Sequence, residues 1–167
     1  MSETAAVLAL VFGIYFGFSA AKRLKERESA LFQTFQFLLS LKLSLEYGGK
    51  PLGAMLEALF REERFRSYSF LSAALKEIQR GAALPKAWET AAKCEEKMLG
   101  AECCALLLRV GAAIGTTDKP GQSELLSREL LRLDELCKNA KQKREHCAVL
   151  FRAAGAFAGF AVFILVI

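Results

Sequence analysis

Residue patterns that carry chemistry are scarce in this sequence. It contains one histidine, His146, which lies in a basic stretch where it is a poor general base for a serine or cysteine nucleophile. It has no glycine-rich phosphate-binding loop, because the run from Gly111 to Gly115 is expected to end a helix. The predicted membrane spans described below hold no Asp, Glu, His or Lys that would mark an ion or proton path. These absences predict a protein that is not an enzyme and binds no cofactor.

Motifs for nucleic acid and for metal are also missing. No zinc-finger, helix-turn-helix or RNA-binding pattern is visible, so the net charge of +5 does not indicate a nucleic-acid partner. The five cysteines are odd in number and lack C-x-x-C spacing, which favours reduced thiols. A metal site made by Cys137, His146 and Cys147 is disfavoured, because adjacent residues on a helix point about 100° apart. We therefore predict neither a nucleic-acid partner nor a metal site.

A long run near each end of the chain carries no charge. The 18 residues at 4–21 carry none, and neither do the 15 residues at 153–167. As a helix the first run is about 27 Å long, against roughly 30 Å for the hydrocarbon core of a bilayer. The second run reaches about 30 Å when it is extended back to Ala148 and Arg152 snorkels to the headgroups. The expected division of the chain is a transmembrane helix at 4–21, a helical domain at 22–147 and a second transmembrane helix at 148–167.

Each terminal run has an alternative interpretation. A cleaved signal peptide would carry positive charge before its apolar run, whereas Met1, Ser2 and Glu3 stand there. A C-terminal helix buried in a soluble domain would normally be apolar on one side, whereas residues 157–167 are apolar on every side. Both comparisons favour membrane spans.

Basic residues flank both predicted spans on their inner side. They are Lys22, Arg23, Lys25 and Arg27 after the first span, and Lys138, Lys141, Lys143, Arg144 and Arg152 before the second. The positive-inside rule then places the intervening residues in the cytoplasm and both termini across the membrane. Anionic headgroups account for much of the positive charge, and the lipid bilayer is the first expected partner.

Glycine and proline divide the rest of the chain into helices. Neither residue occurs from Phe18 to Tyr47, so the first span should continue as a helix with a seven-residue leucine stripe at Leu24, Leu31, Leu38 and Leu45. Four shorter helices are expected: one after Pro51, one over 69–80 that ends at Gly81, one after Pro85 and one over 101–114. A long uninterrupted helix is expected over 123–154. The predicted fold is all-α: a cytoplasmic antiparallel bundle of about six helices between two terminal transmembrane helices.

Each predicted span also carries two glycines four residues apart. These are Gly13 with Gly17, and Gly155 with Gly159. Small residues at this spacing let helix backbones approach closely in a membrane. The pairs could join the two spans to each other or join copies of the chain into a homo-oligomer, and the pattern leaves both open.

Several segments, taken in order, resemble a known family. They are Ala21-Lys22-Arg23 after the first span, the run from Glu46 to Leu52, the segment from Gly81 to Trp88, and the run from Gly111 to Asp118 followed by Gln122. Together with the terminal spans they make the chain similar, over essentially its whole length, to the stage III sporulation protein AB family of endospore-forming bacteria.

The resemblance implies a non-enzymatic part of the secretion-like channel complex that joins mother cell to forespore. The central domain would resemble the cytoplasmic domains of type II secretion and type IV pilus platform proteins. Its implied partners are a secretion-type ATPase, stage III sporulation protein AA, and other stage III sporulation channel proteins. The implied location is the mother-cell-side (outer forespore) membrane. This inference rests on family analogy.

Two loops are the first places to expect a docked partner, because loops held by a rigid scaffold often bind. Their candidate residues are Tyr47, Gly48, Gly49 and Pro51 in the first, and Gly111, Gly115, Asp118 and Gln122 in the second. The alternative is that these residues only end and cap helices. The alternative function, from another class, is a membrane-anchored regulatory or sensory adaptor whose bundle binds a soluble signalling partner.

Overall fold

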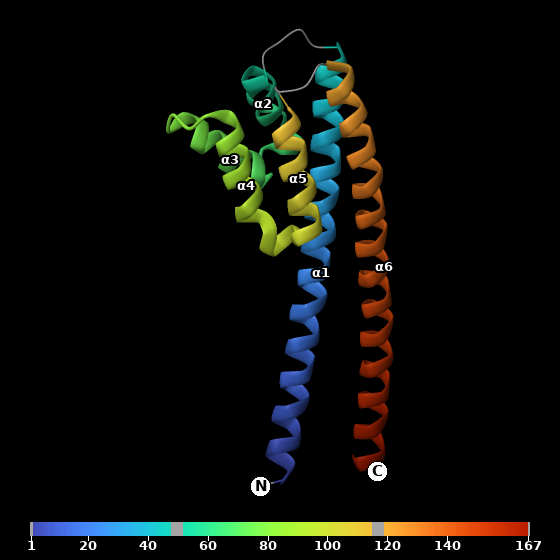
Figure 1. Cartoon of the computed structure of the whole chain (residues 1–167). Helices are drawn as coiled ribbons and strands as arrows, with labels where there is room; N and C mark the ends of the chain where they lie inside the picture. Colours follow the sequence, from blue (N-terminus) through green and yellow to red (C-terminus); the bar gives the residue numbers. More distant parts are fainter. Residues whose placement is uncertain (1, 48–51, 115–118, 167) are drawn as a thin grey trace. The chain divides into compact units, whose positions relative to one another are not determined.

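The computed structural model describes residues 2–47, 52–114 and 119–166, and the side chains of 19–47, 53–114, 120–148 and 150. Over that part of the chain it is all-α, with six α-helices and one 3-10 turn, which confirms the predicted helical bundle (Figure 1). The elements are α1 (Ser2–Tyr47), α2 (Leu52–Arg61), η1 (Glu63–Phe65), α3 (Ser69–Gln79), α4 (Leu84–Leu99), α5 (Ala101–Ala113) and α6 (Lys119–Val166).

The helix ends follow the expected punctuation. Gly81 follows α3 with φ +90°, a left-handed conformation that suits glycine, and Pro85 lies in the first turn of α4. Gly100 has the same φ and separates α4 from α5. The charged break after α2 contains η1, whose Phe65 is buried. The predicted stop at Gly48-Gly49 lies outside the described residues.

The chain divides into two compact units, which are described separately below. Unit 1 comprises Met1–Glu28 and Lys138–Ile167, and unit 2 comprises Ser29–Cys137. Because α1 and α6 are long, each of them passes from one unit into the other. Among the described residues, no helix is apolar over enough length to cross a bilayer. The structure does not describe most of the side chains in the predicted spans at 4–21 and 148–167.

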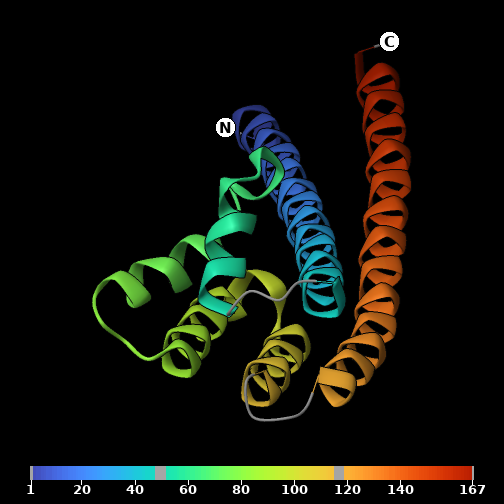
Figure 2. The ribbon, with the colours of Figure 1, turned by 90° about the horizontal axis from the view of Figure 1, so that it is seen from above.

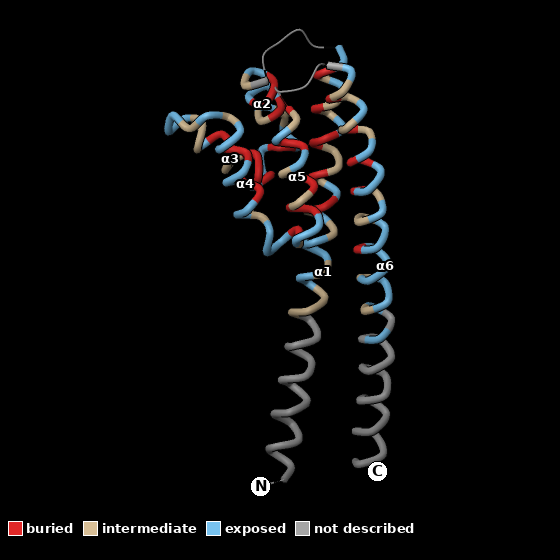
Figure 3. The backbone as a smooth tube through the Cα atoms, viewed as in Figure 1, coloured by how far each residue is buried: buried red, intermediate tan, exposed pale blue. Residues whose placement is uncertain are grey.

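Unit 2 is built around one face of α1. The predicted leucine stripe is buried there at Leu31, Leu38 and Leu45, whereas Leu24, in unit 1, is half-buried (Figure 3). In the same unit α4 packs against α3 and α5, and the adjoining part of α6 lies beside α1 (Figure 2). Residues three or four apart on α1 thus share one buried side, as a helix period requires.

Aromatic rings fill the centre of unit 2. The ring of Phe37 lies 5.5 to 6.0 Å, centroid to centroid, from four others. The rings of Phe70 and Trp88 meet edge to face at 4.9 Å, a favoured aromatic geometry. The members of this cluster are Phe37, Phe65, Tyr68, Phe70 and Trp88. The cluster comes from α1, η1, α3, α4 and the residue before α3, so it joins most of the unit.

Candidate functional site

The helix α1 is apolar on two opposite sides within unit 2. One side is the buried stripe of the core. The other holds Phe32, Leu39, Leu43 and Tyr47, which are 39 to 86% exposed. At 100° per residue these four lie within about 80° of one another and roughly opposite the buried leucines. We call Phe32, Leu39, Leu43 and Tyr47 the α1 face.

The α1 face is a candidate docking surface for a helix. Single exposed apolar residues need no explanation, but four along one side of a helix form a patch of the kind that marks an interaction site. From Phe32 to Tyr47 the face is about 22 Å long, the length of roughly four helical turns. Gln36, half-buried, interrupts it. A partner helix with an apolar stripe matches this geometry.

The charged residues that border the α1 face already interact with neighbouring residues of unit 2. Lys42 and Glu46 form an ion pair at 3.6 Å, one turn apart. The hydroxyl of Ser123 on α6 also donates a hydrogen bond to Glu46. The carboxylate therefore joins α1 to α6 and is already engaged. Attraction at the α1 face must come mainly from apolar burial.

A buried hydrogen bond fixes α1 against the residue preceding α3. Tyr68 Oη donates to Thr34 Oγ1 at 2.8 Å, and Thr34 donates in turn to the Ala30 carbonyl at 2.8 Å. Burial raises the pKa of Tyr68, so the phenol stays neutral and keeps its proton for this bond. Thr34 is buried on the same side of α1 as the leucine stripe, and these two hydrogen bonds satisfy its hydroxyl group.

Gly111 lies inside α5 and packs against Trp88. A Cβ at position 111 would come 2.2 Å from the indole Cδ1, so only glycine leaves room for the ring. The indole N–H donates to the Leu107 carbonyl at 2.7 Å. The expectation that Gly111 caps a helix or faces a partner is therefore wrong, because the residue is buried and α5 continues to Ala113.

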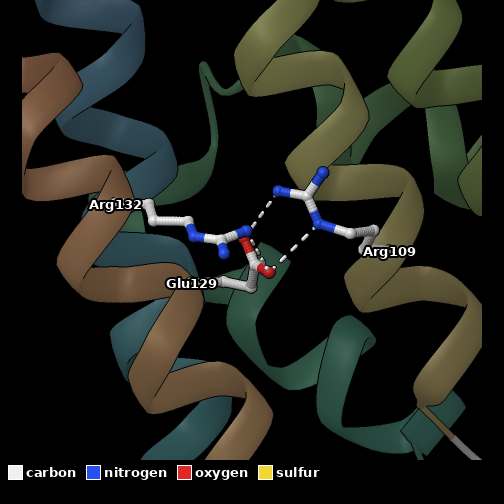
Figure 4. A network of polar contacts seen from close by, with 3 residues as sticks. All are labelled: Arg109, Glu129 and Arg132. Atoms are coloured by element: carbon white, nitrogen blue, oxygen red, sulfur yellow. Dashed lines mark hydrogen bonds and ion pairs between the residues drawn. The ribbon is translucent and has the colours of Figure 1, made fainter.

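A carboxylate of α6 is held between two guanidinium groups (Figure 4). Glu129 is 2% exposed and accepts hydrogen bonds from Arg109 Nε at 3.0 Å and Arg109 Nη2 at 2.8 Å. Arg132 Nη1 donates to the same carboxylate at 3.3 Å. The Arg109 hydrogen bonds hold the pKa of Glu129 below its ordinary value, so the carboxylate is charged at neutral pH. This network ties α5 to α6.

The described part of the chain offers little for catalysis or metal binding. His146 is exposed on α6. Burial raises the pKa of the Cys104 thiol, which donates to the Ala92 carbonyl at 3.4 Å, so it is a poor nucleophile. No group of three or more His, Cys, Asp or Glu side chains suited to a metal occurs among the described residues.

The remaining loop residues have mixed outcomes. Tyr47 is the last residue of α1 and is well exposed, as a partner-facing residue would be. Gln122 is buried in unit 2, so it faces the bundle and not a partner. The other candidates lie outside the described residues: Gly48, Gly49, Pro51, Gly115 and Asp118.

The predicted membrane-flanking residues lie in unit 1. Lys22, Arg23, Lys25 and Arg27 on α1 are exposed, as are Lys141 and Lys143 on α6, whereas Arg144 is half-buried. Arg144 Nε lies 3.0 Å from Glu28 Oε2. The side chain of Arg152 and the surroundings of Gly13, Gly17, Gly155 and Gly159 lie outside the description.

Comparison with known proteins settles the family. A family model described as Stage III sporulation protein AB matches residues 4–167. The chain belongs to the stage III sporulation protein AB family. A solved structure titled "Stage III sporulation protein AB (SpoIIIAB)" is similar with a TM-score of 0.62 and 22% identity, covering 72% of this chain and 98% of that one. At that identity the likeness shows a shared fold. None of the curated proteins matches.

Two features of this family member were not anticipated from its sequence. The α1 face has a signal in the sequence, because Phe32, Leu39 and Leu43 recur with a helical period on the side of the helix opposite the leucine stripe. Glu129 has no role in the sequence-based prediction. Its signal was its place between Leu126, Leu130 and Leu133, where an amphipathic helix would present an apolar residue.

Proposed function

We propose that this stage III sporulation protein AB family member is a non-enzymatic membrane platform component of the channel complex between mother cell and forespore. In this proposal the runs at 4–21 and 148–167 anchor it in the outer forespore membrane, and unit 2 lies in the mother-cell cytoplasm. Unit 2 docks a secretion-type ATPase, stage III sporulation protein AA, and links it to other stage III sporulation channel proteins. Family membership supports the sporulation role.

The α1 face is the observation that supports docking. It exposes four large apolar side chains on a helix whose opposite side is fully occupied by the core of unit 2. Burying an exposed leucine contributes about 1.5–3 kcal/mol, so two or three such side chains suffice for a specific contact of moderate strength. A platform that responds to an ATPase cycle needs such a contact, because it must form and release.

The interior of unit 2 supports a rigid docking scaffold. Tyr68 bonds Thr34, Trp88 bonds the Leu107 carbonyl, and Arg109 bonds Glu129. Buried polar groups that are satisfied in this way fix the register of helices. These contacts hold the helices of unit 2 to one another and do not involve the α1 face. A docking domain is expected to combine a rigid interior with an exposed binding surface in this way.

Capture from sporulating cells tests the proposal. The tagged full chain should co-purify with the ATPase and with channel subunits. Leu43→Glu should reduce ATPase recovery at least about tenfold, because a charge in an apolar interface is costly to desolvate. Leu131→Glu is the matched control, since Leu131 is also an exposed leucine, at 70%, and belongs to α6 and not to α1. It should leave recovery unchanged.

Failure to recover either the ATPase or channel subunits with the wild-type chain would contradict the platform role. Recovery of a soluble signalling protein in their place would favour a membrane-anchored regulatory adaptor. A deletion separates the two further, because loss of a platform should stop development after engulfment and leave vegetative growth intact.

A further inference from the structure

The net charge of the chain resides entirely in unit 1. Unit 2 carries fourteen Lys and Arg against fourteen Asp and Glu, so it is neutral. Unit 1 carries nine basic residues against four acidic ones, which equals the +5 of the whole chain. A charge imbalance confined to one unit indicates a partner of opposite charge for that unit alone.

The basic residues of unit 1 come from two helices. We call eight of them the basic belt: Lys22, Arg23, Lys25 and Arg27 of α1, and Lys138, Lys141, Lys143 and Arg144 of α6. All are exposed except Arg144, which is half-buried. The two contributing segments are six and seven residues long by sequence, so along their helices they extend about 9 and 10 Å.

Acidic residues in unit 1 cancel only part of the belt. Lys22 lies 3.8 Å from Glu26 in an exposed pair, and Arg144 lies 3.0 Å from Glu28. The Glu28 Oε2 atom is buried and accepts no hydrogen bond from the described residues, so Arg144 compensates it by proximity. This pair joins α1 to α6 within the belt. Exposed cations remain at Arg23, Lys25, Arg27, Lys141 and Lys143.

We propose that the basic belt binds anionic phospholipid headgroups and gives the chain a preference for anionic lipid in the bilayer around it. The proposal rests on the membrane anchoring proposed above. The charge-free run at 4–21 ends directly before Lys22, and the belt residues of α6 precede the apolar C-terminal run. The polar layer of a bilayer is roughly 5–7 Å deep per leaflet, so the belt residues nearest the apolar runs lie within this layer, and the long side chains of the others can reach its phosphates.

The position of the belt favours lipid over an acidic protein. A protein docked on unit 2 would not meet the excess charge, because that unit is neutral. Headgroups lie at a fixed level next to the apolar runs, where the belt residues of both helices are found. The Debye length near 8 Å at physiological salt confines the attraction to this layer.

The lipid that surrounds the full-length chain provides the test. The chain is reconstituted in bilayers of equal parts phosphatidylcholine and phosphatidylglycerol, excised with polymer into native discs, and its lipid is quantified. Each Lys or Arg near an anionic surface contributes roughly a fivefold factor in affinity. Wild-type discs should therefore be enriched in phosphatidylglycerol about twofold or more over the bulk bilayer. The triple variant Lys25→Gln, Lys141→Gln and Lys143→Gln removes three of the five exposed cations named above, so its enrichment should fall well below that of wild type, toward the bulk ratio.

A matched variant controls for charge as such. Lys76, Lys86 and Lys97 are exposed lysines of unit 2, and replacing all three with Gln removes the same charge outside the belt. This control should keep the wild-type enrichment. Equal enrichment in wild type and the belt variant would overturn the proposal, as would enrichment lost equally in both triple variants. An acidic protein that binds wild type but not the belt variant, with no lipid preference, would assign the belt to a protein partner instead.

Alkaline carbonate extraction tests the proposed membrane anchoring separately from the lipid preference of the basic belt. A chain that resists extraction but shows no anionic preference contradicts the belt alone. A chain released by carbonate contradicts the membrane anchoring, whatever the lipid ratio.

Discussion

Trp88 rests directly on Gly111, with its indole N–H bonded to the Leu107 carbonyl one turn earlier on α5. The glycine takes part in no turn, since it lies within a helix. Because glycine has no side chain, the Trp88 indole of α4 can pack directly against the backbone of α5. A position that reads as a helix end in the sequence is therefore a packing position.

Gly111→Ala should destabilise unit 2. The added Cβ would clash with a rigid indole, and overpacking of this kind costs about 1–3 kcal/mol. The better helix propensity of Ala returns only about 0.5–1 kcal/mol. Because Trp88 is the one tryptophan in the chain, its fluorescence during urea unfolding of the full chain in detergent reports the change directly.

Gly53→Ala is the control for that measurement. Gly53 lies in α2 with no atom within 4 Å of its would-be Cβ, so the same substitution should stabilise by about 0.5–1 kcal/mol. Two substitutions of identical chemistry should thus have opposite signs. Equal effects at both positions would show that the contact with Trp88 is not what requires glycine at position 111.

Arg109→Met should destabilise unit 2 by about 2 kcal/mol, because it removes two charge-assisted hydrogen bonds and leaves Glu129 buried with Arg132 alone. Adding Glu129→Met should recover a large part of that loss, since replacing both members of a buried pair is often nearly neutral. Arg132→Met should cost less than about 1 kcal/mol, because Arg132 is exposed. A double-mutant cycle in urea measures the coupling, and strict additivity would rule out the network as a unit.

Acid should weaken unit 2 through the same carboxylate. The pKa of Glu129 is lowered in the folded state from an ordinary 4.5, chiefly by the Arg109 hydrogen bonds. Its contribution is therefore complete above pH 4.5 and is lost as the pH falls through the lower, folded value. The difference in unfolding free energy between wild type and Glu129→Gln should be level at neutral pH and shrink below about pH 4.5. A difference that grows on acidification would contradict the assigned protonation.

Topology can be tested with the cysteines of the chain itself. All five lie between the two predicted spans, at positions where the proposed orientation is cytoplasmic. In vegetative cells that express the chain, where it would insert in the outer cell membrane itself, a membrane-impermeant maleimide should not label wild type in intact protoplasts but should label the exposed Cys94 after permeabilisation. The Ser2→Cys variant should be labelled without permeabilisation. Labelling of wild type in intact protoplasts would place the body on the other side.

The helices themselves were predictable because their signals are local. A stretch without Gly or Pro up to Tyr47 predicts the length of α1, and Gly81 and Pro85 predict the break between α3 and α4. The seven-residue leucine stripe likewise predicts which side of α1 is buried. Each of these follows from backbone conformation or helix period alone.

The roles of individual residues were less predictable because they depend on contacts between helices. Nothing near Gly111 in the sequence reveals that Trp88 lies over it. Glu129 resembles any surface carboxylate until Arg109, twenty residues earlier, is placed opposite. The exposure of the α1 face could not be predicted in the same way. Only the structure shows that the leucine stripe packs into the core while the second apolar side of α1 stays exposed.

Site-specific photo-crosslinking in sporulating cells would show whether the proposed ATPase partner binds at the α1 face. A photoreactive amino acid replaces Leu43 on the face or, as control, Leu131 on α6, both of which are exposed leucines in the full-length chain. We expect a crosslinked adduct with stage III sporulation protein AA from position 43 and none from position 131. An adduct from position 131 alone, or from neither position while the two proteins still co-purify, would contradict it.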